Sequence, residues 1–256
     1  MSEQIRDYYD DFSQHYDHGR DRGYHAMVDA IEVGAVIDVA RGKSVLEVGC
    51  GTGLLLEKVA REAAHATGVD LSPGMLLGAR ARGLNVSEGN ATALPFEDAQ
   101  FDVAYSFKVL AHVPEIERAV SELFRVVKPG GHVLIEVYNR ASLRFVSRWL
   151  GGARRIGQRH RENEVPTRWE HVSEAIARLP KDAHVERLVG ARVLTPMAGI
   201  YRLPFAEQLW TPLEIRLAGS RLARFGGFVI IVAREPFAKW LCFLMARGLR
   251  ARWNSP

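Results

Sequence analysis

The chain has 256 residues, with 34 basic and 30 acidic side chains and a formal net charge of +4. This length suits one large α/β domain, and so mild a charge argues against nucleic acid as the partner. Cys50 and Cys242 do not make a disulfide framework, so we expect a reduced, cytoplasmic protein. We expect neither a signal peptide nor a membrane span, because the N-terminus is polar and no apolar run is long enough.

Residues 1–41 are predicted to be helical. An aromatic and acidic stretch, Tyr8 to Asp17, precedes a segment from Met27 to Val39 in which apolar residues recur every four positions. The first stretch is either a cap over a ligand site or an amphipathic packing helix, and the sequence alone leaves both open.

The most informative stretch is Ser44 to Asp70. An apolar run breaks into Gly49-Cys50-Gly51-Thr52-Gly53, and an amphipathic segment and a second apolar run then lead to Asp70. This succession of strand, glycine turn, helix, strand and acid favours a nucleotide or nucleoside site at the carboxyl edge of a parallel sheet. Glycines allow a close approach of the backbone to a ligand, and the acid can accept hydrogen bonds from ribose hydroxyls.

The acid that precedes the glycine turn helps to identify the ligand. Glu47 would repel a pyrophosphate but attract a cationic ligand, and the spacing G-C-G-T-G differs from the dinucleotide pattern G-x-G-x-x-G. A nicotinamide-dependent oxidoreductase is therefore disfavoured. An ordinary glycine turn of an α/β protein remains the alternative.

The chain continues with alternating elements as far as Val137. Ser72 and Pro73 are typical of a helix start. The elements expected after Asp70 are a helix to about Arg82, strands at 84–88 and 101–107, a helix at 115–127, the turn 128–131 and a strand at 132–137.

Several of these stretches resemble class I S-adenosylmethionine (SAM) dependent methyltransferases, of the type 11 and ubiquinone/menaquinone methyltransferase kind. They are 8–17, 47–53, 89–96, 101–107 and 128–131. The resemblance implies a Rossmann-like α/β fold with a mostly parallel seven-stranded sheet, order 3-2-1-4-5-7-6, and helices on both faces. It implies one domain: an N-terminal cap (1–41), a SAM-binding core (44–138), a substrate-side insertion and cover (139–225), and a last strand with a C-terminal helix (226–256).

The resemblance also implies SAM as cofactor. The glycines would cradle its methionine part, Asp70 its ribose, and residues 71, 75, 90 and 91 its adenine. The full predicted set is Tyr16, Glu47, Gly49, Cys50, Gly51, Gly53, Asp70, Leu71, Met75, Asn90, Ala91 and Phe107. Asn90 replaces the acid usual in the family; its amide oxygen can still accept a hydrogen bond, but without the charge.

The expected reaction is methyl transfer to a small molecule, with oxygen favoured as the target and carbon second, on a natural-product, quinone or lipid-like acceptor. His112, after the fourth strand, is the first candidate for a catalytic base and His15 the second, with a packing role as the alternative for His112. Tyr24, His25 and His171 are further candidates for the acceptor pocket, and Lys108 is expected to be a solvated loop residue. No metal-ligand spacing is present, so no metal is expected. A SAM-binding protein without catalysis is the alternative function.

Seven arginines and no acid occur in residues 140–161. This segment is interpreted as a solvated loop, as a site for an anionic substrate group, or as a membrane-surface contact together with the basic amphipathic segment 237–253. That last segment otherwise packs on the sheet or on a second subunit of a homodimer. We further expect a helix at 170–179, a helical cover at 196–223, and two last strands, 185–194 and 227–233, in antiparallel arrangement.

Overall fold

The computed structural model describes residues 6, 10, 13, 16, 17, 19–151, 155–156, 160–161 and 166–236. Seven strands in this part of the chain form one sheet, in the order β3-β2-β1-β4-β5-β9-β8. Their bounds are β1 (Ser44–Val48), β2 (His65–Asp70), β3 (Asn85–Glu88), β4 (Phe101–Ser106), β5 (Val127–Tyr138), β8 (His184–Ala191) and β9 (Phe228–Arg234). Strands β1 to β5 are parallel, and β9 is antiparallel to both of its neighbours. The predicted order 3-2-1-4-5-7-6 is confirmed.

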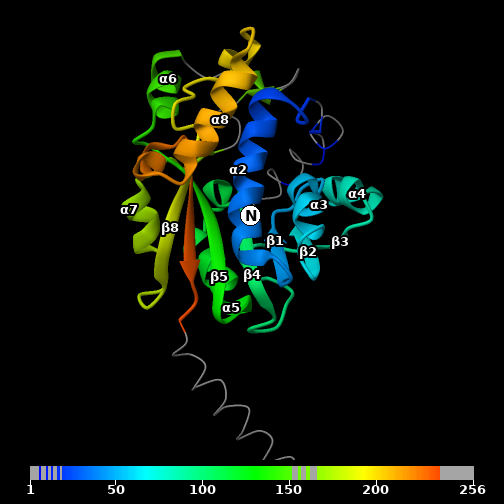
Figure 1. Cartoon of the computed structure of the whole chain (residues 1–256). Helices are drawn as coiled ribbons and strands as arrows, with labels where there is room; N and C mark the ends of the chain where they lie inside the picture. Colours follow the sequence, from blue (N-terminus) through cyan, green and yellow to red (C-terminus); the bar gives the residue numbers. More distant parts are fainter. Residues whose placement is uncertain are drawn as a thin grey trace, which may run out of the picture.

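Helices cover both faces of the sheet, as predicted, and Figure 1 shows α2 lying across one face. That face packs against α2 (Gly23–Ala40), α3 (Leu54–Ala60) and α8 (Ala206–Ala218), and the other against α5 (Ile116–Val126) and α7 (Val172–Ala177). The helix α4 (Pro73–Ala81) lies along β2 and β3. Alternate side chains of β5 divide between the two cores: Val133, Ile135 and Val137 face α5, whereas Leu134 and Tyr138 face α2.

Two predicted segments take a different form. The turn 128–131 is part of β5, which begins at Val127, and the pairing of β5 with β4 shifts register there because Gly130 has a positive φ of 79°. The arginine-rich segment is not only a loop: it contains the helix α6 (Leu143–Gly151) and the short strands β6 (Arg155–Ile156) and β7 (His160–Arg161). The predicted segment 237–253 lies outside the described residues.

One end of the sheet gathers the segments that matter for function. The parallel strands end there, and α6, α8 and the N-terminal segment lie at the same end (Figure 1). Because β9 runs the opposite way, its first residue, Phe228, pairs there with Tyr138 of β5 and Ala191 of β8. The short helices η2 (Leu110–His112), η3 (Ala198–Arg202) and η4 (Arg221–Phe225) complete the described elements of the chain.

Among the described helices, none combines the length and the apolar character that a membrane crossing requires.

Candidate functional site

The glycine turn between β1 and α3 is tightly packed at its two ends. Gly49 and Gly53 have φ angles of 81° and 82°, which favour glycine. A Cβ atom on Gly49 would lie 2.2 Å from Val109, and one on Gly53 would lie 2.3 Å from Leu84. These two glycines are therefore required by the packing of the protein itself.

The middle glycine differs from the other two. A Cβ atom on Gly51 would have only the Met75 sulfur within 4.0 Å, so the turn leaves space in front of this residue. The Gly51 N–H donates to Asp70 over 2.8 Å, and the Ser72 N–H donates to the other carboxylate oxygen of Asp70 over 2.9 Å. The arrangement is an open cradle with an acid beside it, which fits an extended nucleoside ligand such as SAM.

Asp70 is partly buried. Burial raises its pKa, and the backbone hydrogen bonds from Ser72, Gly51 and Leu71 offset part of that rise. Each carboxylate oxygen can accept more than one hydrogen bond, so the acid retains acceptor capacity for ribose hydroxyls.

Glu47 faces the interior beneath the turn. Its side chain is buried, and the Tyr105 hydroxyl donates to it over 3.0 Å. Burial raises the pKa of Glu47 to about 8. The hydrogen bond from Tyr105 offsets part of this rise, whereas the charges of Glu32 and Asp70 add to it. At neutral pH the acid is therefore mostly protonated, and a nearby cation would favour its ionised form.

The remaining predicted cofactor residues differ in how deeply they are buried. Met75 is buried on α4, while Ala91 and Phe107 belong to the two main cores. Leu71 is partly exposed and follows Asp70 directly. Cys50 is buried and its pKa is raised by that burial, so it is not a reactive thiol.

Asn90 is already engaged with its own turn. Its side-chain oxygen accepts hydrogen bonds from the backbone N–H and the hydroxyl of Thr92, both over 3.0 Å. A carbonyl oxygen has two lone pairs, so an adenine amino group would have to displace one of these bonds.

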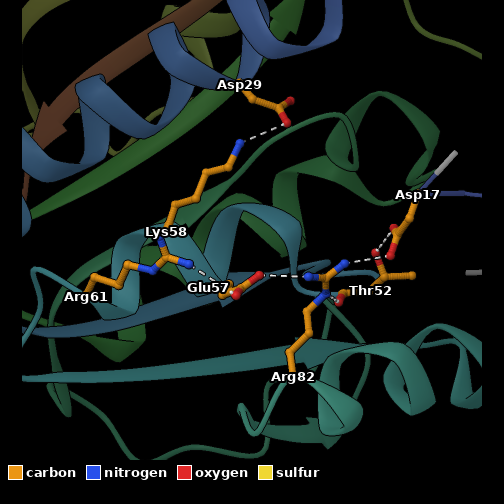
Figure 2. Close-up of polar contacts among 7 residues, drawn as sticks. All are labelled: Asp17, Asp29, Thr52, Glu57, Lys58, Arg61 and Arg82. Carbon is orange, nitrogen blue, oxygen red and sulfur yellow. Dashed lines mark hydrogen bonds and ion pairs between the residues drawn. The ribbon is translucent and has the colours of Figure 1, made fainter. Parts of the chain in front are cut away.

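Two acids of the N-terminal segment reach the cofactor edge. Asp17 accepts from the Thr52 hydroxyl over 2.6 Å and from Arg82 over 2.7 Å, and Arg82 also pairs with Glu57 over 2.7 Å, as Figure 2 shows. Asp10 accepts from the Ser72 hydroxyl and, over 2.9 Å, from the Gly74 N–H at the start of α4. These contacts place the segment over the glycine turn. Tyr16, also on this segment, lies under the Arg20 guanidinium, 4.8 Å from its ring centre, whereas His15 lies outside the described residues.

His112 occupies η2, directly after β4. Its Nδ1 lies 3.0 Å from the Pro166 carbonyl oxygen, and its ring meets Tyr138 edge-on at 5.9 Å. A carbonyl can only accept, so Nδ1 must carry a proton and donate it. Burial lowers the pKa of His112, so the ring is neutral at pH 7 and Nε2 holds the lone pair.

Lys108 is the clearest departure from expectation. It was predicted to be solvated, and that prediction is wrong: its ammonium lies 2.7 Å from Glu32, which has a side chain 0% exposed. Burial alone would lower the pKa of Lys108, but the Glu32 carboxylate more than offsets this and raises it. Lys108 also has a positive φ of 60°, a conformation that turns the chain sharply at the end of β4.

Two acids of α2, Asp29 and Glu32, are buried. Asp29 pairs with Arg20 over 3.0 Å and with Lys58 over 3.4 Å, and the second pair is drawn in Figure 2. Glu136, near the end of β5, is also buried, and burial together with Glu32 raises its pKa well above the usual range. Charged and polar groups thus lie between α2 and the ends of β4 and β5.

Aromatic rings lie next to these charged groups. Tyr138 contacts Phe228 at 5.0 Å and Trp169 at 5.5 Å, both edge-on. The Arg144 guanidinium of α6 lies over all three rings, 4.2 Å from the Phe228 centre. His112, Lys108 and these rings therefore line one region at the carboxyl ends of β4 and β5.

The helix α2 contributes the other predicted acceptor-side residues. Tyr24 meets His25 at 4.9 Å and Tyr201 of η3 at 6.3 Å, and it receives a hydrogen bond from Arg192 over 3.2 Å. His171 instead precedes α7, where its backbone N–H donates to Glu174 over 2.7 Å.

Three residues of this region were not predicted from the sequence: Glu32, Glu136 and Arg192. A usable signal existed for Glu32, because Asp29 and Glu32 interrupt the apolar face of a helix that is otherwise expected to be buried. Within the described residues, no group of three or more metal-binding side chains is present.

Comparison with known proteins identifies the family. Residues 46–135 match the family described as a methyltransferase domain. The chain is 31% identical over 201 residues to a demethylmenaquinone methyltransferase of Thermobifida fusca, covering 75% of this chain and 83% of the relative. It is 38% identical over 117 residues to a ubiquinone biosynthesis O-methyltransferase of Alkalilimnicola ehrlichii, covering 43% of this chain and 47% of that relative.

Solved structures show the same fold. A SAM-dependent methyltransferase of Thermotoga maritima, described as a possible histamine N-methyltransferase, superposes with a TM-score of 0.65 at 21% identity, covering 90% of this chain and 99% of that one. The N-methyltransferase NodS of Bradyrhizobium japonicum, solved with S-adenosyl-L-homocysteine, gives a TM-score of 0.58 at 15% identity, covering 91% and 100%. The chain belongs to the class I SAM-dependent methyltransferases, with SAM as its methyl donor.

Proposed function

We propose that the protein methylates a hydroxyl of a small aromatic acceptor, of the kind found in quinone biosynthesis, with His112 as the base. The observation that carries this proposal is the hydrogen bond of 3.0 Å between His112 Nδ1 and the Pro166 carbonyl. It leaves Nε2 as the acceptor of a proton. A hydroxyl nucleophile must lose its proton during the transfer, and a positioned imidazole can take it.

The walls of the acceptor region support a planar substrate. Trp169 and Phe228 each meet Tyr138 edge-on, and a further aromatic ring can join such a group by stacking or edge contact. Two relatives are named for menaquinone and ubiquinone biosynthesis, and the second is an O-methyltransferase. Methylation of a ring carbon is the second candidate, and it uses the same walls.

The cofactor side follows from the glycine turn. When bound, SAM supplies a methyl group already activated on a sulfonium. We place its ribose at Asp70 and its cationic methionine part near Gly51 and Glu47, because Gly51 has open space in front of it, its N–H donates to Asp70, and Glu47 is a buried acid. Residues 44–138 would then hold the cofactor, and the cap (1–41) and the cover (139–225) would enclose the acceptor.

The test is transfer of a radiolabelled methyl group from SAM to catechol-type quinone precursors. His112→Ala should lower kcat by about 10²–10⁴-fold, the usual contribution of a general base, with SAM affinity unchanged. His184→Ala is the matched control, because His184 is exposed at the start of β8. Mass spectrometry of the product separates methoxy from ring-methyl products. Full turnover in His112→Ala would remove the base assignment, and a ring-methyl product would select carbon.

We also propose contact with a membrane surface, which would suit a lipid-like acceptor. Trp149 of α6 is 79% exposed, and Phe205 and Leu209 at the start of α8 are 72% and 69% exposed. Both helices lie at the acceptor end (Figure 1), and large exposed apolar side chains next to arginines favour an interface. Co-sedimentation with anionic vesicles should fall for Trp149→Glu and stay unchanged for Leu77→Glu on α4, where Leu77 is 67% exposed.

A further inference from the structure

Arg192 is an unusual residue at the end of β8. Its φ is 63°, in the left-handed region, and the residue is only 6% exposed. Such a conformation is unfavourable for a residue other than glycine, so the surrounding structure must hold it in place. A charged side chain is therefore buried in a strained position at the acceptor end of the sheet.

All hydrogen bonds of the Arg192 guanidinium within the described residues go to uncharged acceptors. Nε donates to the Thr195 carbonyl over 3.2 Å, Nη2 to the Pro196 carbonyl over 2.9 Å and Nη1 to the Tyr24 hydroxyl over 3.2 Å. A guanidinium has five N–H donors, so these contacts leave two of them for another partner.

No carboxylate among the described residues pairs with Arg192. Glu214, which attracts it through space, is turned toward the loop after β8. Its oxygens accept from the N–H groups of Val193 and Leu194 and from the Thr195 hydroxyl. Burial lowers the pKa of Arg192, as expected for a buried cation without a paired anion.

The neighbours of Arg192 are aromatic rings and further cations. The guanidinium lies 5.0 Å from the Tyr24 ring centre and 6.0 Å from that of Phe228, and Lys108 lies 5.7 Å from the same Phe228 ring. Burial and the charges of Arg20, Lys108 and Arg192 together lower the pKa of nearby His25 to about 4. His25 is itself an exposed residue, so this group of side chains extends to the protein surface.

We propose that Arg192 binds an anionic oxygen, a carboxylate or an ionised phenol, on the aromatic methyl acceptor. This inference rests on the proposed function and adds the charge of its substrate. Two free N–H donors match a planar oxyanion, and Phe228 and Tyr24 can contact the ring that carries it. Arg192 is then a specificity-determining residue, distinct from the base His112.

The experiment measures binding by calorimetry to protein saturated with S-adenosyl-L-homocysteine at pH 7. The probes are 3,4-dihydroxybenzoate against its neutral amide, and 4-nitrocatechol, which ionises near neutral pH, against catechol. We expect the anionic member of at least one pair to bind about 10- to 100-fold more tightly, the range of a charge-assisted hydrogen bond. A preference within the first pair indicates that Arg192 binds a carboxylate, and a preference within the second pair indicates a phenolate.

The variant Arg192→Gln should lose this preference, and Arg192→Lys should keep part of it. Arg187→Gln is the matched control, since Arg187 lies on β8, the strand that Arg192 follows, and pairs with Asp38 on the surface over 3.0 Å. Equal affinities within both pairs for the wild type, binding of no probe, or an unchanged preference in Arg192→Gln would each overturn the assignment. If Arg192→Gln does not fold, an unchanged preference in Arg192→Lys overturns it and a reduced one supports it. Failure of S-adenosyl-L-homocysteine itself to bind would instead refute the proposed function.

Discussion

The cofactor side and the acceptor side of this protein are built in different ways. The centre of the proposed cofactor side is held by backbone groups, since the N–H groups of Gly51 and Ser72 donate to Asp70. The proposed acceptor side instead consists of side chains from six separate segments, represented by Tyr24, Lys108, Tyr138, Trp169, Arg192 and Phe228. A backbone-built site depends on chain geometry and tolerates few substitutions at its glycines, whereas a side-chain-built site can change its chemistry one residue at a time.

The largest expected effect lies on the acceptor side. Lys108→Met leaves the Glu32 carboxylate, with a side chain 0% exposed, without its ammonium. We expect the free energy of unfolding to fall by about 3–5 kcal/mol, measured by urea denaturation, because an unpaired buried charge is strongly destabilising. The double variant Lys108→Met/Glu32→Leu should recover most of this loss.

Lys128→Met is the control for that change, because Lys128 pairs with Asp102 with its side chain 44% exposed and should contribute less than about 1 kcal/mol. Equal losses for Lys108→Met and Lys128→Met would show that the buried pair has no special structural role.

The second effect isolates the cofactor side. Asp70→Ala should weaken SAM binding by about 1.5–3 kcal/mol, the range for hydrogen bonds to a charged group, with the acceptor affinity little changed. Calorimetry with SAM gives this value, and Asp70→Asn should lose less because an amide oxygen still accepts. An unchanged SAM affinity in Asp70→Ala would place the ribose elsewhere.

The third effect concerns the pH dependence of Glu47. Its pKa is about 8 in the folded protein and near 4.5 when unfolded, so between these values only the folded state holds the proton. Stability of the wild type therefore falls as pH rises through this window, by at most about 1.4 kcal/mol per pH unit. Glu47→Gln should abolish this loss, and thermal unfolding at pH 6, 7 and 8 would measure a growing difference between the two proteins.

The same residue links stability to binding. A bound cation favours the ionised form of Glu47, so wild-type SAM affinity should increase toward pH 8, while that of Glu47→Gln should not. Parallel pH profiles of the two proteins would mean that SAM does not contact this acid electrostatically.

The smallest effect tests the N-terminal segment. Asp17 has a side chain 40% exposed, so its pair with Arg82 contributes less than about 1 kcal/mol to stability. Asp17→Ala should nevertheless release S-adenosyl-L-homocysteine faster, by up to about fivefold, in stopped-flow measurements. Glu62→Ala, which removes an exposed ion pair with Arg41, should leave that rate unchanged. If Glu62→Ala accelerated the release as much as Asp17→Ala does, the N-terminal segment would have no specific role in retaining the cofactor.

This contrast also explains what the sequence could predict. The glycine turn and the position of Asp70 depend on local spacing and on the direction of parallel strands, and they were predictable, whereas the strand order came from the family resemblance. Lys108 and Arg192 were not, because each gains its role from partners far away in the chain, Glu32 and Tyr24. A lysine after a strand is ordinarily solvated; only the path of α2 over that strand end buries this one.

The antiparallel direction of β9 has a consequence for how such an enzyme can diversify. The segment 192–227, which connects β8 to β9, leaves the sheet and returns to the same edge. There the Gly227 N–H donates to the Arg192 carbonyl over 3.1 Å. The Asn139 side chain fixes the C-terminal end of this segment by donating to the Arg224 and Gly226 carbonyls over 2.8 and 3.0 Å. Residues 192–227 therefore form a cassette with adjacent ends. Exchange of this cassette between related enzymes should transplant acceptor preference and leave the seven-stranded sheet intact.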